Sequence, residues 1–500
     1  MDLFSNLAIG FETAFLASNL MYCFVGVLLG TLIGVLPGLG PLATISMLLP
    51  ITFGLPPASA LIMLAGIYYG AQYGGSTTAI LLRLPGESSS VVTALDGHEM
   101  AKQGRAGTAL ATAAIGSFIA GTVATFLVAL LSPPLAAVAL KFGAAEYFSL
   151  MLLGLVISVL LASGSILKAM AMVVLGILLG LAGQDVNTGT FRFTFGIPEL
   201  ASGFSFLALS MGIFGLGEIM RNLETETSRT LVANKVRGLI LTREDWRRII
   251  APVLRGTGLG SALGILPGGG AVLSSFVSYS VEKRVARDPS AFGKGAIEGV
   301  AGPESANNAG AQTSFIPMLT LGIPSNPVMA LMIGALILQG IQPGPNVISA
   351  RPELFWGVIV SMWIGNLMLV VLNLPLIGIW VRILTIPYRF IFPAIGVFCC
   401  LGVYSVSNNA FDVVSMCVFG LVGYLLLKLE CEPAPLLLGF VIGPLMEENF
   451  RRAMLIARGD WSTFVTRPIS LGLLVVCVLA LLAVLSPVLR KRREEAFTET

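Results

Sequence analysis

The sequence predicts an all-α integral membrane protein with about 10–12 transmembrane helices, in two homologous and inverted repeats with paired discontinuous or re-entrant helices. Only 11% of the 500 residues are charged and 55% are hydrophobic, whereas about a quarter of a soluble domain is charged. Apolar stretches of roughly 18 or more residues, long enough to cross a bilayer, recur along most of the chain. Similar motifs also return in the same order in the two halves.

Hydrophobic periodicity and length place the expected spans. Several are too short, or too interrupted by glycine and proline, to cross unbroken, so we expect re-entrant pieces among full crossings. The expected spans are residues 18–37, 57–70, 107–131, 145–163, 167–183, 200–220, 257–280, 305–322, 325–342, 354–377, 384–403, 411–428, 434–446 and 469–489.

Basic residues predict the topology. Eight Lys and Arg lie between residues 221 and 255, and four more follow the last span at 490–493. Cytoplasmic loops carry an excess of these residues, so both segments are predicted to be cytoplasmic. The segment before the last span then lies on the outer side. This placement conflicts with the rule, because the segment contains Arg451, Arg452, Arg458 and Arg467. An amphipathic helix at the interface is one way to reconcile them.

An internal repeat is the sharpest signal in the sequence. GTLIGVLPGLG at 30–40 is echoed by GSALGILPGGG at 260–270, and YGGSTTAILLRLPGESS at 73–89 by NAGAQTSFIPMLTLGIPSN at 308–326. Two weaker pairs follow, 153–170 with 401–416 and 215–223 with 444–453. We therefore divide the chain into a repeat at 1–225, a basic cytoplasmic linker at 226–255, a second repeat at 256–455, and a final helix with a basic tail at 456–500. Duplication kept only for packing is the alternative, and the inverted orientation rests on loop charge alone.

The best-matched blocks are those that break helices. Proline and glycine stop an apolar helix after Leu36 and after Leu266, and we expect it to restart near Leu42 and Ala271. A restarting helix presents free N–H groups and a partial positive charge, which suit an anion. This predicts substrate contacts at Gly38, Gly40, Gly268 and Gly269, and Na⁺ contacts at the exposed carbonyls of Leu36 and Leu266. A simple turn between short helices is the competing interpretation.

A second element places small polar side chains at membrane depth. Hydroxyls and amides can bind carboxylate oxygens or a cation at lower desolvation cost than full charges. We predict that the substrate contacts Ser76, Thr77, Thr78, Asn307, Asn308, Thr313, Ser314, Ser325 and Asn326, and that an ion contacts Gly75, Glu87 and Gln312. Glu304 is a further candidate to bind a cation or a proton, although Glu87 and Glu304 would both also fit in loops. Close helix packing by small residues is the alternative for each hydroxyl.

Other functions find little support. The chain has no nucleotide-binding P-loop sequence, and its one histidine, His98, is expected in a loop, so we predict no catalytic residue and no metal site apart from Na⁺. An intramembrane enzyme needs a nucleophile and base, or an acid pair, on facing helices, and no convincing set is present. The net charge of +3 gives no reason to expect nucleic acid.

Five long strings resemble the large membrane subunit of the tripartite tricarboxylate transporters. They are GVLPGLGPLATISMLLPITF, YYGAQYGGSTTAILLRLPGE, ALDGHEMAKQGRAG, GILPGGGAVLSSF and GPESANNAGAQTSFIPMLTLGIPSNPVMALM. The resemblance implies a multi-pass permease of the bacterial inner membrane that takes up small carboxylates, driven by a Na⁺ or H⁺ gradient and without a cofactor. It also implies two partners: a small membrane subunit of about four helices and a periplasmic solute-binding protein. A channel or a non-transporting scaffold subunit is the alternative.

Overall fold

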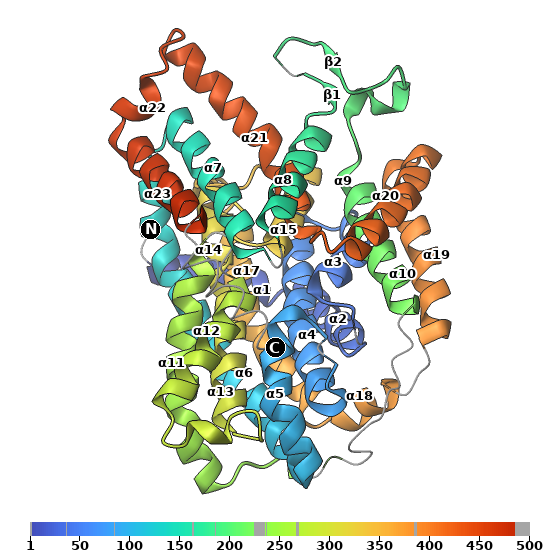
Figure 1. Cartoon of the computed structure of the whole chain (residues 1–500), viewed down its shortest axis with the longest axis vertical. Helices are drawn as coiled ribbons and strands as arrows, with labels where there is room; N and C mark the ends of the chain where they lie inside the picture. The colour runs from blue at the N-terminus through green and yellow to red at the C-terminus, as the bar shows by residue number, and fades with distance from the viewer. Residues whose placement is uncertain are drawn as a thin grey trace.

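The computed structural model describes residues 3–36, 38–84, 86–162, 165–185, 187–224, 236, 238–266, 270–384 and 388–485. Within these ranges the protein is almost entirely helical, and two short strands form one hairpin (Figure 1). The predicted all-α class is therefore confirmed.

The first part of the chain runs from the N-terminus to Glu224. Its helices begin with α1 (Leu3–Ala14), α2 (Ala17–Gly34), α3 (Pro41–Thr52), α4 (Pro57–Leu82), η1 (Ser88–Ser90), α5 (Val91–Met100), η2 (Ala101–Arg105), α6 (Ala106–Ala139), α7 (Ala144–Leu161) and α8 (Ile166–Gly180). Strands β1 (Gly183–Gln184) and β2 (Phe191–Arg192) pair antiparallel. Then come η3 (Pro198–Ser202), α9 (Phe206–Ser210), η4 (Met211–Leu216) and α10 (Gly217–Glu224).

The second part begins at Arg243, inside the segment that we assigned to the linker. It contains α11 (Arg243–Ile265), α12 (Gly270–Val285), η5 (Pro289–Ala291), α13 (Glu298–Thr313), α14 (Phe315–Leu321), α15 (Pro327–Leu338), α16 (Val347–Ala350) and α17 (Pro352–Asn373). It ends with α18 (Ile377–Ile383), α19 (Tyr388–Ser407), α20 (Ala410–Lys428), α21 (Ala434–Ile456), α22 (Thr463–Thr466) and α23 (Pro468–Leu485).

Glycines bring two pairs of helices into backbone contact. Gly26, Gly30 and Gly34 on α2 face the backbone of α4, one glycine on each successive turn. Gly256, Gly260 and Gly264 on α11, each 230 residues later, face α13 in the same way. A Cβ atom at any of these six positions would meet backbone atoms of the neighbouring helix. Small residues at four-residue spacing allow this close approach between membrane helices.

Two more helix contacts link elements distant in the sequence. Gly176 and Gly180 of α8 pack against α21, and Gly420 and Gly423 of α20 pack against η4. In Figure 1 the group α11, α12 and α13 lies at the lower left, and α2, α3 and α4 lie right of the centre. Helices α7, α8, α21, α22 and α23 lie above them.

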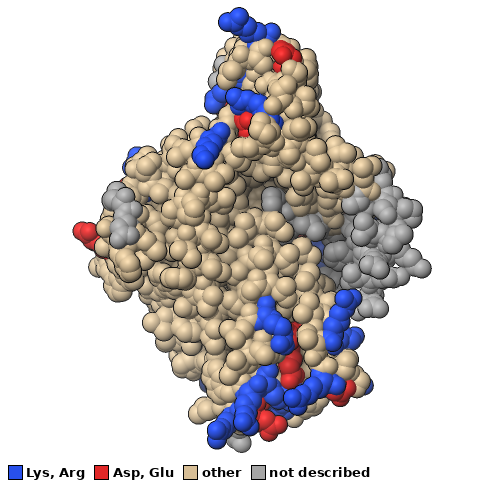
Figure 2. Space-filling view, turned by 90° about the vertical axis from the view of Figure 1, so that its left-hand side faces the viewer, with Lys and Arg blue, Asp and Glu red and all other residues tan. Residues whose placement is uncertain are grey.

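Fewer helices than predicted qualify as single spans. Among the described residues, 5 are long and apolar enough to cross a bilayer, and 6 further apolar helices have only 10–17 residues. The expected number of about 10–12 full crossings is larger because breaks and short turns divide many apolar runs. On the face shown in Figure 2, charged side chains gather mainly at the two ends of the long axis, with a wide band of other residues between them. Both findings are those of a multi-pass membrane protein.

Three of the four arginines that conflicted with the predicted topology are paired with carboxylates. Arg451 contacts Asp185 at 3.0 Å and Glu447 at 2.6 Å, and Arg467 contacts Glu146 at 2.7 Å. Arg452 pairs with Glu448 within the same helix. This end of the molecule, uppermost in Figure 1, lies opposite the start of α11. The positive charge of these three arginines is therefore offset locally.

We predict that Gly260→Ala lowers the melting temperature, because the added methyl group forces α11 away from the backbone of Ala306 on α13. Overpacking of this kind costs about 1–3 kcal/mol. Gly258→Ala is the matched control, since it lies on the same helix with nothing within 4 Å of its Cβ position. Thermal unfolding of both variants in detergent measures the effect, and equal melting temperatures would contradict the proposed packing.

The β1–β2 hairpin gives a pH prediction. Hydrogen bonds from the Asn187 backbone N–H and the Thr188 hydroxyl, with the charges of Arg451 and Arg192, lower the pKa of Asp185 from 3.8 to about 2. A carboxyl whose folded pKa is depressed stabilises the fold above its unfolded pKa, and this contribution is lost as the pH falls through the folded value. We expect Asp185→Asn to lower the melting temperature by a constant amount from pH 8 to about pH 4. The difference from the unsubstituted protein then shrinks toward pH 2. Asp288→Asn, which removes a carboxyl whose pKa is lowered mainly by hydrogen bonds from Ser290, should give a smaller difference over the same pH range.

Candidate substrate and ion site

Side chains from α4 and α10 form hydrogen bonds with the backbone of the first helix break, which lies between α2 and α3. Helix α2 ends at Gly34, and the Thr78 hydroxyl on α4 donates a 2.8 Å hydrogen bond to the Val35 carbonyl. Gly38 has a φ of +80°, a conformation that favours glycine, and its carbonyl accepts from the Asn222 amide at 3.1 Å. Gly40 then caps α3, whose first residue is a proline. The interruption and restart predicted here are present.

Glu87 is buried beside this break. Its side chain packs against Gly75, and it also lies next to Gly40 at the start of α3. The Asn307 amide on α13 donates to Glu87 Oε1 at 3.1 Å. Among the described residues, no Lys or Arg forms a salt bridge with Glu87. A buried carboxyl group without a basic partner therefore lies beside the N-terminal end of α3.

The second break has the same construction with a neutral residue in place of the acid. Asn326 caps α15 by accepting from the Met329 N–H at 3.0 Å, and its amide donates to the Ser314 hydroxyl at 3.0 Å. Ser325 donates to the Ser314 carbonyl at 3.3 Å. Gly270, the first residue of α12, lies against Asn326. The predicted contacts Gly268 and Gly269 lie outside the described residues.

The two breaks approach each other across α4 and α13. Asn307 on α13 reaches Glu87, and Tyr68 on α4 lies beside Asn326. Asn307 stands 239 residues after Tyr68, and Asn326 stands 239 residues after Glu87. Each break is thus contacted by the partner helix at an equivalent position.

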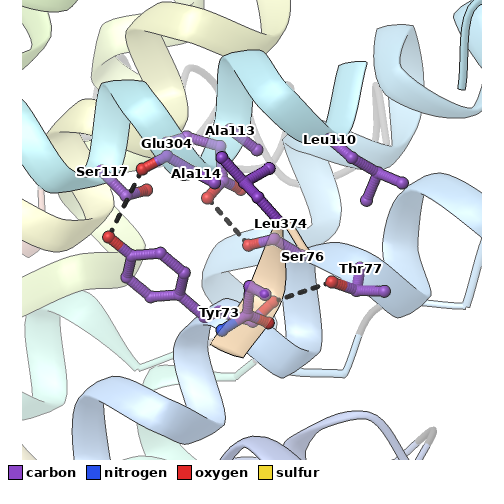
Figure 3. A pocket seen from close by; sticks show the side chains of 10 residues that line it. Tyr73, Ser76, Thr77, Leu110, Ala113, Ala114, Ser117, Glu304 and Leu374 are labelled. Atoms are coloured by element: carbon purple, nitrogen blue, oxygen red, sulfur yellow. Dashed lines mark hydrogen bonds between the residues drawn. The ribbon is translucent and has the colours of Figure 1, made fainter. Parts of the chain in front are cut away.

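A third group of predicted residues points elsewhere, to a small cavity between α4, α6 and α13 (Figure 3). Ser76 donates to Glu304 Oε2 at 2.8 Å, and Thr93 donates to Glu304 Oε1 at 2.5 Å. Thr77 lines the same cavity. The Asn308 amide donates to the Ser117 hydroxyl at 2.7 Å. The structure therefore divides the predicted set between the two breaks and this cavity.

The other predicted residues are placed as follows. Thr313 bonds the Ala309 carbonyl and lies against Gly264. Gln312 accepts from Thr125 on α6 at 3.4 Å, and its Nε2 has no partner among the described residues. The Leu36 carbonyl accepts from the Leu39 N–H at 3.2 Å, and Leu266 is 51% exposed. Of the four, Thr313 and Leu266 therefore lie at the second break, Leu36 at the first, and Gln312 faces α6.

The comparisons with known proteins agree with this architecture. Residues 20–438 match the model of the tripartite tricarboxylate transporter TctA family. The chain belongs to the TctA family. An uncharacterised 52.8 kDa protein of Agrobacterium vitis, named for the TAR-I ttuC′ 3′ region, is 63% identical over 499 residues, covering 100% of this chain and 99% of that protein. Another A. vitis protein, named for the TAR-II ttuC′ 3′ region, is 63% identical over 240 residues, covering 48% of this chain and 99% of that protein. No solved structure matches.

Sequence reasoning missed several residues of this TctA-family permease. Ser117, Thr93, Asn222 and Asn373 all contact or line the first break or the cavity. Ser117 and Asn373 are polar residues within apolar runs, which was the available signal for these two. One expectation was wrong: His98 lies within helix α5, where Nδ1 is 3.1 Å from the Ile80 carbonyl, and not in a loop.

Proposed function

We propose that this TctA-family chain performs ion-gradient-driven secondary uptake of small carboxylates, such as tricarboxylates, across the bacterial inner membrane. Family membership makes it the large permease subunit of a transporter. The coupling to Na⁺ or H⁺, the membrane and the partners are our proposal. The observation that carries it is the uncompensated Glu87 carboxylate beside the first helix break.

The carboxylate substrate binds between the two breaks in this proposal. Helices α3 and α12 begin there and direct N–H groups outward, and the Asn326 amide adds N–H hydrogens at the second break. The neutral Asn326 suits an anion better than the equivalent Glu87 does. We therefore assign a carboxylate of the substrate to the Asn326 side.

Glu87 then explains why an ion must accompany the substrate. Two unit negative charges about 4 Å apart repel by roughly 4 kcal/mol at an effective dielectric constant of 20. An anion bound near Gly40 meets this repulsion unless a cation or proton neutralises Glu87. Anion and cation therefore bind better together than alone, which is the thermodynamic basis of symport.

We further propose that the two halves are inverted repeats with re-entrant helical hairpins. The 230-residue glycine spacing and the 239-residue spacing of the break contacts support a two-fold relation. Transport then needs one repeat-derived unit to move against the rest, around a site at the midplane. The breaks at α2–α3 and α11–α12 are the points where gates can form.

The remaining partners follow from the tripartite family. A periplasmic solute-binding protein delivers the carboxylate, and a small membrane subunit of about four helices completes the complex. The end of the molecule with the β1–β2 hairpin and α22 then faces the periplasm, and the start of α11 faces the cytoplasm. A channel or a scaffold subunit is the competing function, and it predicts no saturable uptake coupled to a gradient.

The decisive experiment measures uptake of labelled citrate into proteoliposomes that contain the complete complex, with an imposed Na⁺ or H⁺ gradient. We expect saturable accumulation above equilibrium that requires one of the gradients. Glu87→Gln should reduce the accumulation ratio at least tenfold, because substrate binding no longer depends on a cation at this residue. Glu99→Gln, which alters a half-buried acid paired with Lys102, is the control and should accumulate substrate normally. Uptake that never exceeds equilibrium would support a channel.

A second variant tests the substrate position. A methyl group added at Gly40 meets only ordinary contacts, at 3.6 Å or more, so Gly40→Ala should fold but reduce the space before α3. We expect the KM for citrate to rise several-fold, measured as initial uptake rates. Gly54→Ala, beyond the other end of α3 with nothing within 4 Å, serves as the control. An unchanged KM in both variants places the substrate elsewhere.

A further inference from the structure

The cavity around Glu304 is separate from the two helix breaks, and several side-chain oxygen atoms belong to the residues that line it. Its lining combines Ser76 and Thr77 of α4, Ser117 of α6, Glu304 of α13 and Asn373 at the end of α17 with apolar side chains. In Figure 3 the Ser117 and Glu304 side chains lie together, above Tyr73 and Ser76. The cavity has a volume of about 10 Å³ for a water-sized sphere. That is enough for about one water molecule or one ion of similar size.

Glu304 is 1% exposed and has no salt bridge among the described residues. Of the five other buried acids among the described residues, all except Glu87 have stronger compensation. Glu282 pairs with Arg255, Glu146 with Arg467 and Asp185 with Arg451, whereas Asp96 Oδ1 accepts three backbone N–H groups. Glu304 instead receives only hydroxyl protons, from Ser76, Thr93 and Ser117. Burying a carboxylate that has only hydroxyl donors costs free energy unless a cation binds beside it.

Asn373 supplies an independent indication of a ligand. Its Nδ2 donates to the Leu369 carbonyl at 2.9 Å within the same helix, which fixes the direction of the amide. Asn373 lines the cavity and is 4% exposed. Its Oδ1 has no hydrogen-bond partner among the described residues. A buried acceptor left without a donor costs about 1–3 kcal/mol. A cation or a water in the cavity removes that cost.

We propose that this cavity binds one Na⁺, coordinated by Glu304, Ser76, Thr77, Ser117 and the Asn373 carbonyl oxygen. All five groups offer oxygen, the donor type preferred by hard cations, and no sulfur or imidazole ligand is present among the lining residues. A single carboxylate matches a single positive charge, whereas Ca²⁺ sites commonly combine several oxygen ligands with more than one carboxylate. A proton requires neither a cavity nor an extra acceptor such as Asn373.

The site explains how an ion can act on the fold. Its ligands come from α4, α6, α13 and the end of α17, so the bound ion connects elements of both halves of the chain. Ser76 lies one residue after Gly75, which packs against Glu87 at the first break. The role of this Na⁺ as the coupling ion rests on the proposed function, but its binding does not.

The test measures Na⁺ binding to the purified full-length chain without substrate. Melting temperature is recorded as NaCl replaces choline chloride at constant ionic strength, with KCl as the ion control. We expect a saturable rise with Na⁺ and little with K⁺. Asn373→Ala and the nearly isosteric Thr77→Val should each raise the half-saturating Na⁺ concentration at least tenfold. Asn346→Ala, an exposed asparagine outside the cavity, is the matched control and should leave it unchanged.

The outcomes separate this inference from the proposed function. A melting temperature that does not respond to Na⁺, or an identical response in Thr77→Val and the unsubstituted chain, would falsify the site and leave a water in the cavity. If Asn373→Ala does not fold, Thr77→Val alone decides. Uptake driven only by H⁺, without Na⁺ stabilisation, overturns the site but preserves ion-coupled transport. Saturable Na⁺ stabilisation without gradient-driven uptake preserves the site and overturns the proposed function.

Discussion

Backbone contact between glycine-lined helices fixes the position of the polar groups at both helix breaks. Helix α2 lies against α4, and α11 lies against α13, with no side chain between them along the glycine rows. Because α2 and α11 both end at a break, this contact decides where the breaks lie relative to α4 and α13. Thr78 and Ser314 can then bond the carbonyls of Val35 and Gly264 at the ends of α2 and α11. The geometry of the breaks is therefore a consequence of close packing that extends over the last turns of α2 and α11.

Charge is distributed unevenly over this symmetrical framework. Equivalent positions carry Glu87 at one break and Asn326 at the other, and each is approached by a side chain of the opposite helix. Glu304 adds a second buried acid near the first break. The two breaks can thus differ in their ligands, the first suited to a cation and the second to an anion. A symmetrical pair of acids would repel the substrate from both sides.

The sequence was sufficient for the fold class, the breaks and the family, because these depend on composition and on local glycine and proline chemistry. The starts of α3 and α12 were predicted within one residue. The sequence alone could not predict how the polar residues are divided between the breaks and the cavity. Ser76 and Thr78 are two residues apart, yet one bonds Glu304 and the other the Val35 carbonyl. That separation follows from the 100° rotation per residue of a helix and from which neighbour lies on each face, which only tertiary packing decides. Asn373 was missed for the same reason, because only the folded structure shows that its Oδ1 has no hydrogen-bond partner among the described residues and that the end of α17 lies at the cavity.

The four-residue period of the glycine rows has a mechanical consequence. A helix that touches its neighbour through backbone atoms cannot slide by one residue, because a side chain would enter the contact. Smooth sliding is therefore blocked, and the next equivalent register is one full period away, about 6 Å along the axis. The helix pairs α2–α4 and α11–α13 should consequently each move as a rigid unit during transport. Any displacement must then occur where these helix pairs end, at hinges beside Gly38 and Gly270, which both have a positive φ.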